Sequence, residues 1–387
     1  MSQIIPVNEP LIGERESEYV MECLRTGWIS SAGRFIKLFE EAWAEYCGRR
    51  YGIAMSNGTV VLEAAVAVLD LQPGDEVIMP TFTIISCAQA ITRFGGVPVL
   101  VDSDPDTWCM DVTQVEAKIT SRTRAIMPVH IYGHPVDMDP LLELAEKYHL
   151  AIIEDAAEVH GADYLTGHSR DLGATGEPNG KWQRCGSFGD MSTFSFYANK
   201  IITTGEGGMV LTDDSTLAQR LRDYRNLCFR PERRFYHTEI GNNYRLTNMQ
   251  AAVGLGQVEQ IDRYLAQKRW LGARYTEQLR DIPGIQLPIE KPWAKHVYWM
   301  YALVLDEATG LDANSFAQKL AALGVRTRPF FLGMHEQPVF HQMGLFQGEQ
   351  YPIAERIARQ GLYLPSGMAL TEAQLDAVCH AVRQVVG

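Results

Sequence analysis

Short apolar runs alternate with helix-forming runs over the first two thirds of the chain, and this alternation constrains the fold more than any other feature. The runs expected to form strands are at residues 77–80, 97–101, 125–131 and 151–154. The runs expected to form helices are at residues 60–69, 84–94 and 140–148. Strands separated by helices predict an α/β fold, with a mostly parallel central sheet flanked by helices.

The pattern changes near residue 258, where a long charged stretch favours a helix over residues 257–279. The elements expected beyond it are a strand at residues 297–305 and helices at residues 315–323 and 371–386. We therefore expect a large α/β domain over residues 1–257 and a smaller C-terminal α+β domain over residues 258–387. Residues 165–184 are rich in glycine and polar side chains, which favours an exposed loop.

Composition restricts the classes of partner and compartment. The formal net charge of −12 argues against nucleic acid and anionic membranes as main partners. The 7 cysteines are scattered and never spaced as CxxC, which argues against a zinc site or a disulfide scaffold and favours a reducing compartment. No secretory signal or membrane-spanning apolar run is visible. We expect a cytoplasmic protein without a metal.

One lysine has neighbours that suggest chemistry. Lys200 lies on a short loop between two strand-like runs, and a glycine cluster follows it at residues 205–208. A lysine held in this way can form a Schiff base with a carbonyl compound, as in pyridoxal phosphate (PLP) enzymes. An isolated lysine is more often an ordinary surface residue. The assignment therefore depends on the other parts of a PLP site.

Those parts occur in the expected order along the chain. Gly58 and Thr59 begin a predicted helix, where unpaired N–H groups favour a phosphate, although a plain helix cap is the alternative. Asp155 ends an apolar run, at the strand end where α/β sheets bind ligands, and could pair with a pyridine nitrogen or only cap a helix. Ser195 could reach the phosphate or only occupy a sheet edge.

The combination resembles the fold-type I aminotransferases, and within them the DegT/DnrJ/EryC1/StrS sugar aminotransferase family. The segments that carry the resemblance lie at residues 27–31, 56–59, 74–77, 154–158, 192–208 and 241–248. The resemblance implies PLP as the cofactor and Lys200 as the lysine that forms the Schiff base and carries the proton. It also implies that Asp155 pairs with the pyridine nitrogen, and that Gly58, Thr59 and Ser195 bind the phosphate.

The resemblance implies further site residues. Asn243 would reach the cofactor phosphate from the second subunit of a homodimer with shared active sites. Glu158 falls where the family places a side chain near the 3′-oxygen of the cofactor. Ile84 stands where many members have an aromatic ring, and it could still pack on the cofactor ring. The residues in stretches that the family uses around the substrate are Trp28, Ser30, Arg328 and His335.

The implied activity is transfer of an amino group from L-glutamate to a nucleotide-linked 4-keto-6-deoxy sugar, by a ping-pong mechanism through a Lys200–PLP Schiff base. Three alternatives stay open: another keto sugar (UDP- or dTDP-linked, a cyclitol or a sugar acid), a PLP-dependent sugar dehydratase, and a PLP-binding regulator without catalysis. The dehydratases among the relatives carry histidine at the Schiff-base position, so Lys200 favours an aminotransferase. The intact set of Asp155, Ser195 and Lys200 argues against a regulator.

Overall fold

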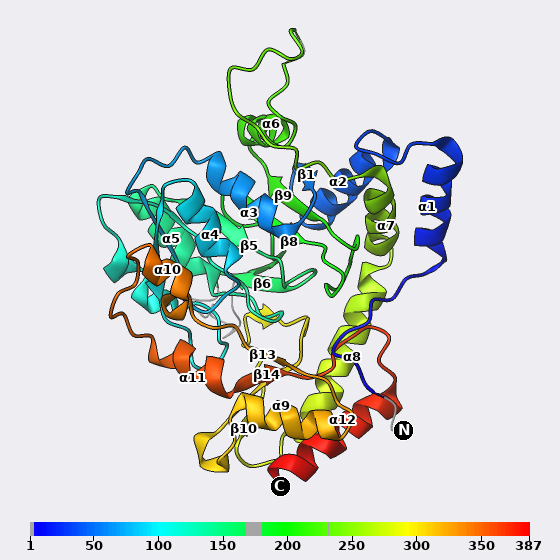
Figure 1. The fold of residues 1–387 in the computed structure, drawn as a ribbon, viewed down its shortest axis with the longest axis vertical. Helices are drawn as coiled ribbons and strands as arrows, with labels where there is room; N and C mark the ends of the chain where they lie inside the picture. Colours follow the sequence, from blue (N-terminus) through cyan, green and yellow to red (C-terminus); the bar gives the residue numbers. More distant parts are fainter. Residues whose placement is uncertain (1–3, 168–179, 231) are drawn as a thin grey trace.

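A computed structural model of the chain describes residues 4–167, 180–230 and 232–387. Its centre is a seven-stranded sheet in the order β1-β9-β8-β5-β4-β2-β3 (Figure 1). The strands of this sheet are β1 (Tyr51–Met55), β2 (Glu76–Pro80), β3 (Val97–Val101), β4 (Thr123–Ile126), β5 (Ala151–Asp155), β8 (Met191–Ser195) and β9 (Gly208–Thr212).

The central sheet is mostly parallel, as the alternation predicts. Strands β8, β5, β4, β2 and β3 pair in parallel, and β9 is antiparallel to both of its neighbours. Because β1 and β9 oppose each other, as do β9 and β8, β1 runs in the same direction as β8. The carboxyl ends of β1, β2, β5 and β8 therefore meet at one edge of the sheet, where ligands bind in such folds.

Helices flank this sheet and continue into the C-terminal part (Figure 1). The helices of the N-terminal part are α1 (Glu14–Thr26), α2 (Arg34–Tyr46), α3 (Gly58–Ala67), α4 (Ser86–Arg93), α5 (Met138–Tyr148) and α6 (Ser215–Tyr224). The later helices are α7 (Asn248–Val258), α8 (Ile261–Leu279), α9 (Ala313–Ala322), α10 (Pro338–Gln342), α11 (Pro352–Gln360) and α12 (Glu372–Val386).

Two smaller sheets complete the fold. A four-stranded antiparallel sheet has the order β10-β12-β14-β13, and a three-stranded sheet has the order β11-β6-β7. Their strands are β6 (Asp163–Thr166), β7 (Lys181–Arg184), β10 (Ile285–Gln286), β11 (Ala294–Lys295), β12 (Ala302–Leu305), β13 (Arg328–Pro329) and β14 (Gly361–Tyr363). Helix α8 leads from the central sheet to the four-stranded sheet (Figure 1).

Two expected strands are shorter than predicted. The strand expected at residues 125–131 ends at Ile126, before Pro128, which has no N–H to offer a sheet. The strand expected at residues 297–305 begins only at Ala302. Tyr298 has a φ of 48°, in the left-handed region, and this backbone conformation interrupts an extended strand.

Two further expectations need correction. The helix expected over residues 257–279 begins later than predicted: residues 257–258 end α7, the helix is interrupted at residues 259–260, and α8 starts at Ile261. The exposed loop expected at residues 165–184 begins and ends in the β6–β7 hairpin, whose strands pair with each other. The centre of that segment lies outside the described residues.

The predicted domain boundary falls where α7 gives way to α8, and the division stays a prediction. A large hydrophobic cluster fills the central sheet region, and a second cluster lies between α8, α12 and the four-stranded sheet. Within the described parts of the chain, we find no helix of the length and hydrophobicity needed to cross a bilayer.

Candidate active site

A cavity of about 740 Å³ opens at the edge where the carboxyl ends of the central strands meet. Seven residues predicted from the sequence to bind the cofactor line it: Gly58, Thr59, Ile84, Asp155, Glu158, Ser195 and Lys200. They come from segments far apart in the chain. The parallel strand ends bring them together.

One end of the cavity suits a phosphate. Helix α3 begins there, and the side chain of Asn57 caps it by accepting a hydrogen bond from the N–H of Val60 at 3.0 Å. Gly58 approaches Ser195 so closely that an added Cβ would lie 2.8 Å from the Cβ of Ser195. The unpaired N–H groups of the first helical turn and the Ser195 hydroxyl therefore share one small space, which favours an anion.

A buried carboxylate faces the cavity from the end of β5. Asp155 is 1 % exposed, and its two oxygens accept hydrogen bonds from the Ala157 N–H at 3.1 Å and from the Cys87 thiol at 3.2 Å. Burial raises the pKa of Asp155, and these two hydrogen bonds and the charge of Lys200 oppose that rise. A cationic ring nitrogen beside Asp155 would stabilise its ionised form further.

Lys200 lies on the loop between β8 and β9, as predicted, with 9 % of its side chain exposed. Its Nζ is 4.0 Å from Oε1 of Glu158 and 3.7 Å from the centre of the Trp299 ring. Burial lowers the pKa of Lys200, although the charges of Glu158 and Asp155 oppose the shift. A larger share of the amine is therefore unprotonated at neutral pH than for a surface lysine.

Glu158 is anchored beside this amine. Its Oε2 accepts a hydrogen bond from the N–H of Tyr132 at 2.8 Å. Burial raises the pKa of Glu158 to about 7, against the opposing effect of Lys200. Near neutral pH this carboxyl can therefore donate a hydrogen bond to a ligand oxygen when protonated, or accept one from a ligand hydroxyl when ionised.

These residues fit pyridoxal phosphate, because each part of the cofactor meets a group of suitable chemistry. The start of α3 and Ser195 suit the phosphate, Asp155 suits the protonated pyridine nitrogen, and the amine of Lys200 suits the aldehyde carbon. Ile84 is 45 % exposed and lines the same cavity, so its side chain is available for an apolar contact with a ring.

Five other predicted residues do not line this cavity within the single chain. Trp28 is 58 % exposed and Ser30 is also exposed, both between α1 and α2. Asn243 is exposed and accepts a hydrogen bond from Arg245 at 2.9 Å. Arg328 is exposed on β13, where it pairs in register with Tyr363, a lining residue.

His335, the fifth of these residues, is buried and held by protein groups. Its Nδ1 lies 2.8 Å from the Thr81 hydroxyl, and its Nε2 lies 3.2 Å from Oε1 of Glu355. Both ring nitrogens therefore have partners in the chain. Tyr351 packs against the ring edge-on, with centroids 4.9 Å apart.

Sequence reasoning missed several lining residues. Glu63 on α3 pairs with Arg93 on α4 and accepts a hydrogen bond from the Tyr244 hydroxyl at 2.7 Å. Trp299 is also a lining residue, and its indole lies under Lys200. Glu63 is a single charge within an apolar helical run, and its pairing with the distant Arg93 depends on how α3 and α4 pack. Trp299 lies in an apolar run that resembles a strand, so no local signal marks it as a lining residue.

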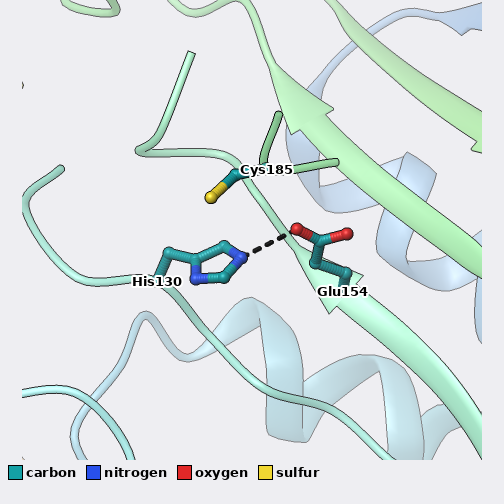
Figure 2. A group of neighbouring side chains, drawn as sticks. All are labelled: His130, Glu154 and Cys185. Atoms are coloured by element: carbon teal, nitrogen blue, oxygen red, sulfur yellow. Dashed lines mark hydrogen bonds and ion pairs between the residues drawn. The ribbon is translucent and has the colours of Figure 1, made fainter. Parts of the chain in front are cut away.

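A buried trio beside the site resembles a metal centre. His130, Glu154 and Cys185 point toward one another (Figure 2), with one potential ligand atom from each lying within 4.8 Å of the others. His130 Nδ1 accepts a hydrogen bond from the N–H of Val136 at 2.8 Å, which places the ring proton on Nε2, 2.9 Å from Glu154. Burial raises the pKa of the Cys185 thiol and so keeps it protonated.

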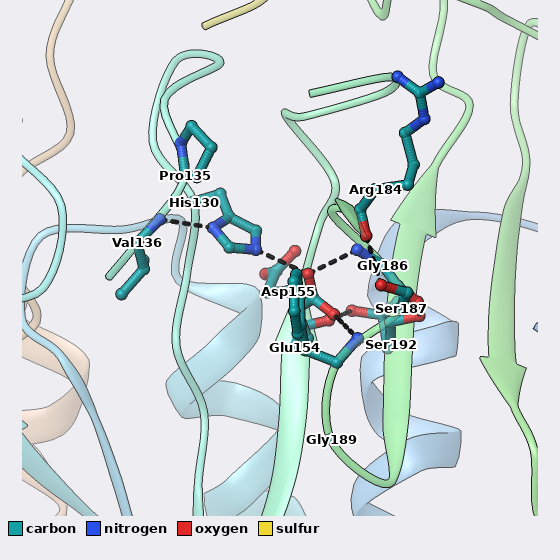
Figure 3. A network of polar contacts seen from close by, with 12 residues as sticks. His130, Pro135, Val136, Glu154, Asp155, Arg184, Gly186, Ser187, Gly189 and Ser192 are labelled. Atoms are coloured by element: carbon teal, nitrogen blue, oxygen red, sulfur yellow. Dashed lines mark hydrogen bonds and ion pairs between the residues drawn. The ribbon is translucent and has the colours of Figure 1, made fainter. Parts of the chain in front are cut away.

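Hydrogen bonding within the protein explains this trio. Glu154 also accepts from the N–H groups of Gly186 and Phe188, and the Ser192 hydroxyl donates to the Gly186 carbonyl (Figure 3). The carboxylate thus has three donors without any ion. Since Glu154 precedes Asp155, the network fixes the end of β5 from which Asp155 reaches the cavity.

Comparisons with known proteins agree with this geometry. Three GDP-perosamine synthases are similar to the chain over nearly its whole length. That of Caulobacter vibrioides is 43 % identical (99 % of this chain, 98 % of the relative), that of Escherichia coli O157:H7 is 40 % identical (98 % of each), and that of Vibrio cholerae is 33 % identical (98 % of each).

Solved structures share the fold. The structure of DesV from S. venezuelae in complex with a ketimine intermediate has a TM-score of 0.85 at 34 % identity, and the match covers 95 % of this chain and 93 % of that chain. The aminotransferase TlmJ of Streptoalloteichus hindustanus has a TM-score of 0.87 at 28 % identity, covering 99 % and 98 %. The profile of one family matches residues 10–383. The chain is therefore a PLP-dependent aminotransferase and belongs to the DegT/DnrJ/EryC1/StrS aminotransferase family.

Proposed function

We propose that the enzyme transfers an amino group from L-glutamate to a GDP-linked 4-keto-6-deoxy sugar, as a GDP-perosamine synthase. The observation that carries the proposal is full-length identity of up to 43 % with three GDP-perosamine synthases. The resemblance of the sequence segments at residues 101–104, 132–135, 202–208, 327–329 and 334–335 to GDP-perosamine synthase supports the same assignment. The dehydratase alternative is not favoured by these relatives.

We assign Lys200 the covalent and proton-transfer roles. When bound, pyridoxal phosphate supplies an electron sink that stabilises negative charge on the carbon next to the amino group. The amine of Lys200 takes the proton from that carbon of the amino donor and later returns a proton, so it must be unprotonated first. Its burial, which lowers its pKa, favours that state.

The other lining residues bind and orient the cofactor in this proposal. Asp155 holds the ring nitrogen in its protonated form, and Gly58, Thr59 and Ser195 hold the phosphate. Glu158 contacts the ring oxygen. Ile84 packs on the ring face, where its apolar side chain excludes water.

We propose roles in substrate binding for Arg328, Trp28, Ser30 and His335, each on a different structural observation. Arg328 is in register with Tyr363 at the cavity and can reach an anionic diphosphate, because its guanidinium is exposed. Trp28 and Ser30 are exposed and away from the cavity of their own chain, so they would serve the site of a second subunit. His335 would act indirectly, by fixing the segment around it near the sugar, because Thr81 and Glu355 already hold both of its ring nitrogens.

A substrate panel tests the proposed specificity. We expect conversion of the GDP-linked 4-keto-6-deoxy sugar with L-glutamate as donor, with kcat/KM for the UDP- and dTDP-linked analogues lower by about tenfold or more. Mass spectrometry measures the rate at which amino sugar forms and the rate at which 2-oxoglutarate is released. Faster turnover of a UDP- or dTDP-linked sugar would contradict the GDP assignment and leave the reaction type intact.

We further propose a homodimer in which Asn243 completes the partner's phosphate site. Two exposed apolar regions support an interface. One contains Trp28 and Ile29, which are 58 % and 48 % exposed. The other is the segment after α6, which projects from the rest of the chain and carries Phe235 and Ile240 at 75 % and 92 % exposure (Figure 1).

Subunit mixing tests the shared site. Lys200→Ala and Asn243→Asp should each be inactive alone, the second because a carboxylate repels the phosphate. Hybrid dimers would contain one site with both natural residues, so a fully exchanged equal mixture should recover about a quarter of the natural activity. Differently tagged subunits would confirm the exchange. An exchanged mixture as inactive as its parents would show that Asn243 does not act across the interface.

We also propose that the enzyme works in the reducing cytoplasm. All seven cysteines are unpaired and buried, as expected for a protein that is not held by disulfides. Cell fractionation would test this location, and recovery outside the cytoplasmic fraction would contradict it.

A further inference from the structure

One lysine is buried without an ion pair to any carboxylate of the described residues. Lys268, on α8, is 2 % exposed, and its Nζ donates hydrogen bonds to the backbone carbonyls of Trp299, at 2.8 Å, and of Ser366. Burial lowers its pKa to about 7. Both an ammonium and a neutral amine can make these two hydrogen bonds. Because removing a lysine from water is costly, its position calls for a reason beyond packing.

Trp299 links this lysine to the active site. The tryptophan is 4 % exposed, and its indole Nε1 donates a hydrogen bond to the carbonyl of Asn199 at 2.8 Å. Its ring lies under the amine of Lys200, with Nζ 3.7 Å from the ring centre. The same side chain therefore contacts both the backbone just before Lys200 and the amine itself.

The contacts form a continuous path between two regions of the fold. Lys268 holds the backbone of Trp299, and the indole of Trp299 holds the loop that carries Lys200. Lys268 also holds the segment at Ser366, whose side-chain oxygen accepts the N–H of Tyr301 at 2.9 Å. The position of the Trp299 ring is thus set from α8 and the four-stranded sheet.

We propose that Trp299 is a positioning residue that holds the amine of Lys200 during turnover, and that Lys268 fixes Trp299 in that position. The inference rests on the proposed role of Lys200. When the amine takes the proton from the carbon of the amino donor it becomes an ammonium. The face of an indole ring attracts such a cation, so the proton-bearing amine stays within reach of the carbon to which it returns the proton.

Four variants separate the contacts. Trp299→Phe keeps a ring face but loses the Nε1–H bond to Asn199, and Trp299→Leu loses both. Lys268→Met keeps the length of the side chain but loses both hydrogen bonds. Tyr275→Phe is the matched control, because it deletes a buried hydrogen bond of 2.8 Å from the same helix to the carbonyl of Pro365, without touching Trp299 or Lys200.

Acetylation of the cofactor-free protein over a range of pH, followed by mass spectrometry of the Lys200 peptide, reports the pKa of this amine. We expect Trp299→Leu to lower the pKa of Lys200, and Trp299→Phe to leave it close to the natural value. Glu158 and Asp155 are unchanged in every variant, so the shift would come from the lost ring. The midpoint of the pH profile is independent of how accessible the amine is.

Steady-state kinetics supply the second readout. We expect Trp299→Leu and Lys268→Met to lower kcat by about 10- to 100-fold, with KM for the sugar nearly unchanged, because the amine is displaced while the substrate contacts remain. Trp299→Phe should lose less. Tyr275→Phe should leave kcat and the pKa of Lys200 unchanged even if it lowers Tm.

The proposal would be overturned if Lys268→Met lowered only Tm, as Tyr275→Phe does, or if Trp299→Leu left both readouts unchanged. If Trp299→Leu does not fold, Lys268→Met decides the test through its effect on kcat, with Tyr275→Phe as its control. Lys200→Ala is measured in the same series. If that variant keeps its activity, the role of Lys200 itself is wrong. If it is inactive while the Trp299 and Lys268 variants behave as the natural enzyme, only the positioning role fails.

Discussion

Lys200→Ala should reduce turnover by about 10⁴-fold or more, because it removes both the nucleophile and the group that moves the proton. The variant should still fold, since the side chain lines a cavity and its removal enlarges a space that is already open. Stopped assays of amino sugar formed from L-glutamate would measure the loss, and circular dichroism would check the fold.

Lys295→Ala is the matched control for this experiment. Lys295 also lies over a tryptophan ring, with its Nζ 4.4 Å from the centre of Trp182, but it is on the surface at β11. Its removal should leave kcat unchanged. Activity of Lys200→Ala within tenfold of the natural enzyme would refute the role of Lys200.

Asp155→Asn should lower kcat by about 10²- to 10³-fold, the effect seen when one electrostatic contact to developing charge is removed. A neutral amide cannot hold a protonated ring nitrogen as a carboxylate does, so negative charge on the reacting carbon would be less stabilised. The size of the side chain is conserved, and the backbone N–H of Ala157 can still donate to the amide oxygen. We expect the larger effect on kcat and a smaller one on sugar KM.

Asp190→Asn tests whether any carboxylate on these strands would matter. Asp190 accepts the N–H of Ile152 at 2.8 Å, at the opposite end of β5 from Asp155. This variant should keep its kcat, although it can lose some stability. Equal kcat values for Asp155→Asn and the natural enzyme would show that Asp155 does not act on the ring.

The predicted residues at the centre of the candidate site line one cavity because they follow strands whose ends can be recognised in the sequence. Asp155 and Ser195 are the last residues of β5 and β8, and Lys200 follows on the next loop. Parallel strands must present their carboxyl ends at one edge, so local patterns were enough to bring these residues together. Gly58 was found in the same way, from the start of a helix after β1.

The other features of the site could not be predicted, because they depend on contacts between segments far apart in the chain. Trp299 and Lys200 are 99 positions apart, as their residue numbers give, and the apolar run around Trp299 resembled a strand. Lys268 resembled one more exposed charge on a helix, because nothing near it in sequence reveals that carbonyls of Trp299 and Ser366 enclose it. The burial of His335 likewise depends on Thr81, far away in the chain.

The predicted ends of several elements were wrong for local reasons, and the sequence shows only some of these reasons. Pro128 ends β4, which hydrophobicity alone would extend. The left-handed backbone of Tyr298 makes β12 begin later than the apolar run does. The hairpin of β6 and β7 was hidden because both strands are short and one is mostly exposed. Hydrophobic alternation is weak in such strands.

The visible absorption spectrum of the purified enzyme, before and after addition of L-glutamate, tests the central claim most directly. A cofactor joined to Lys200 should give a yellow band that bleaches when L-glutamate donates its amino group, and Lys200→Ala should lack this response. A protein that stays colourless after pyridoxal phosphate is added would contradict the account, as would a yellow band that persists unchanged with L-glutamate.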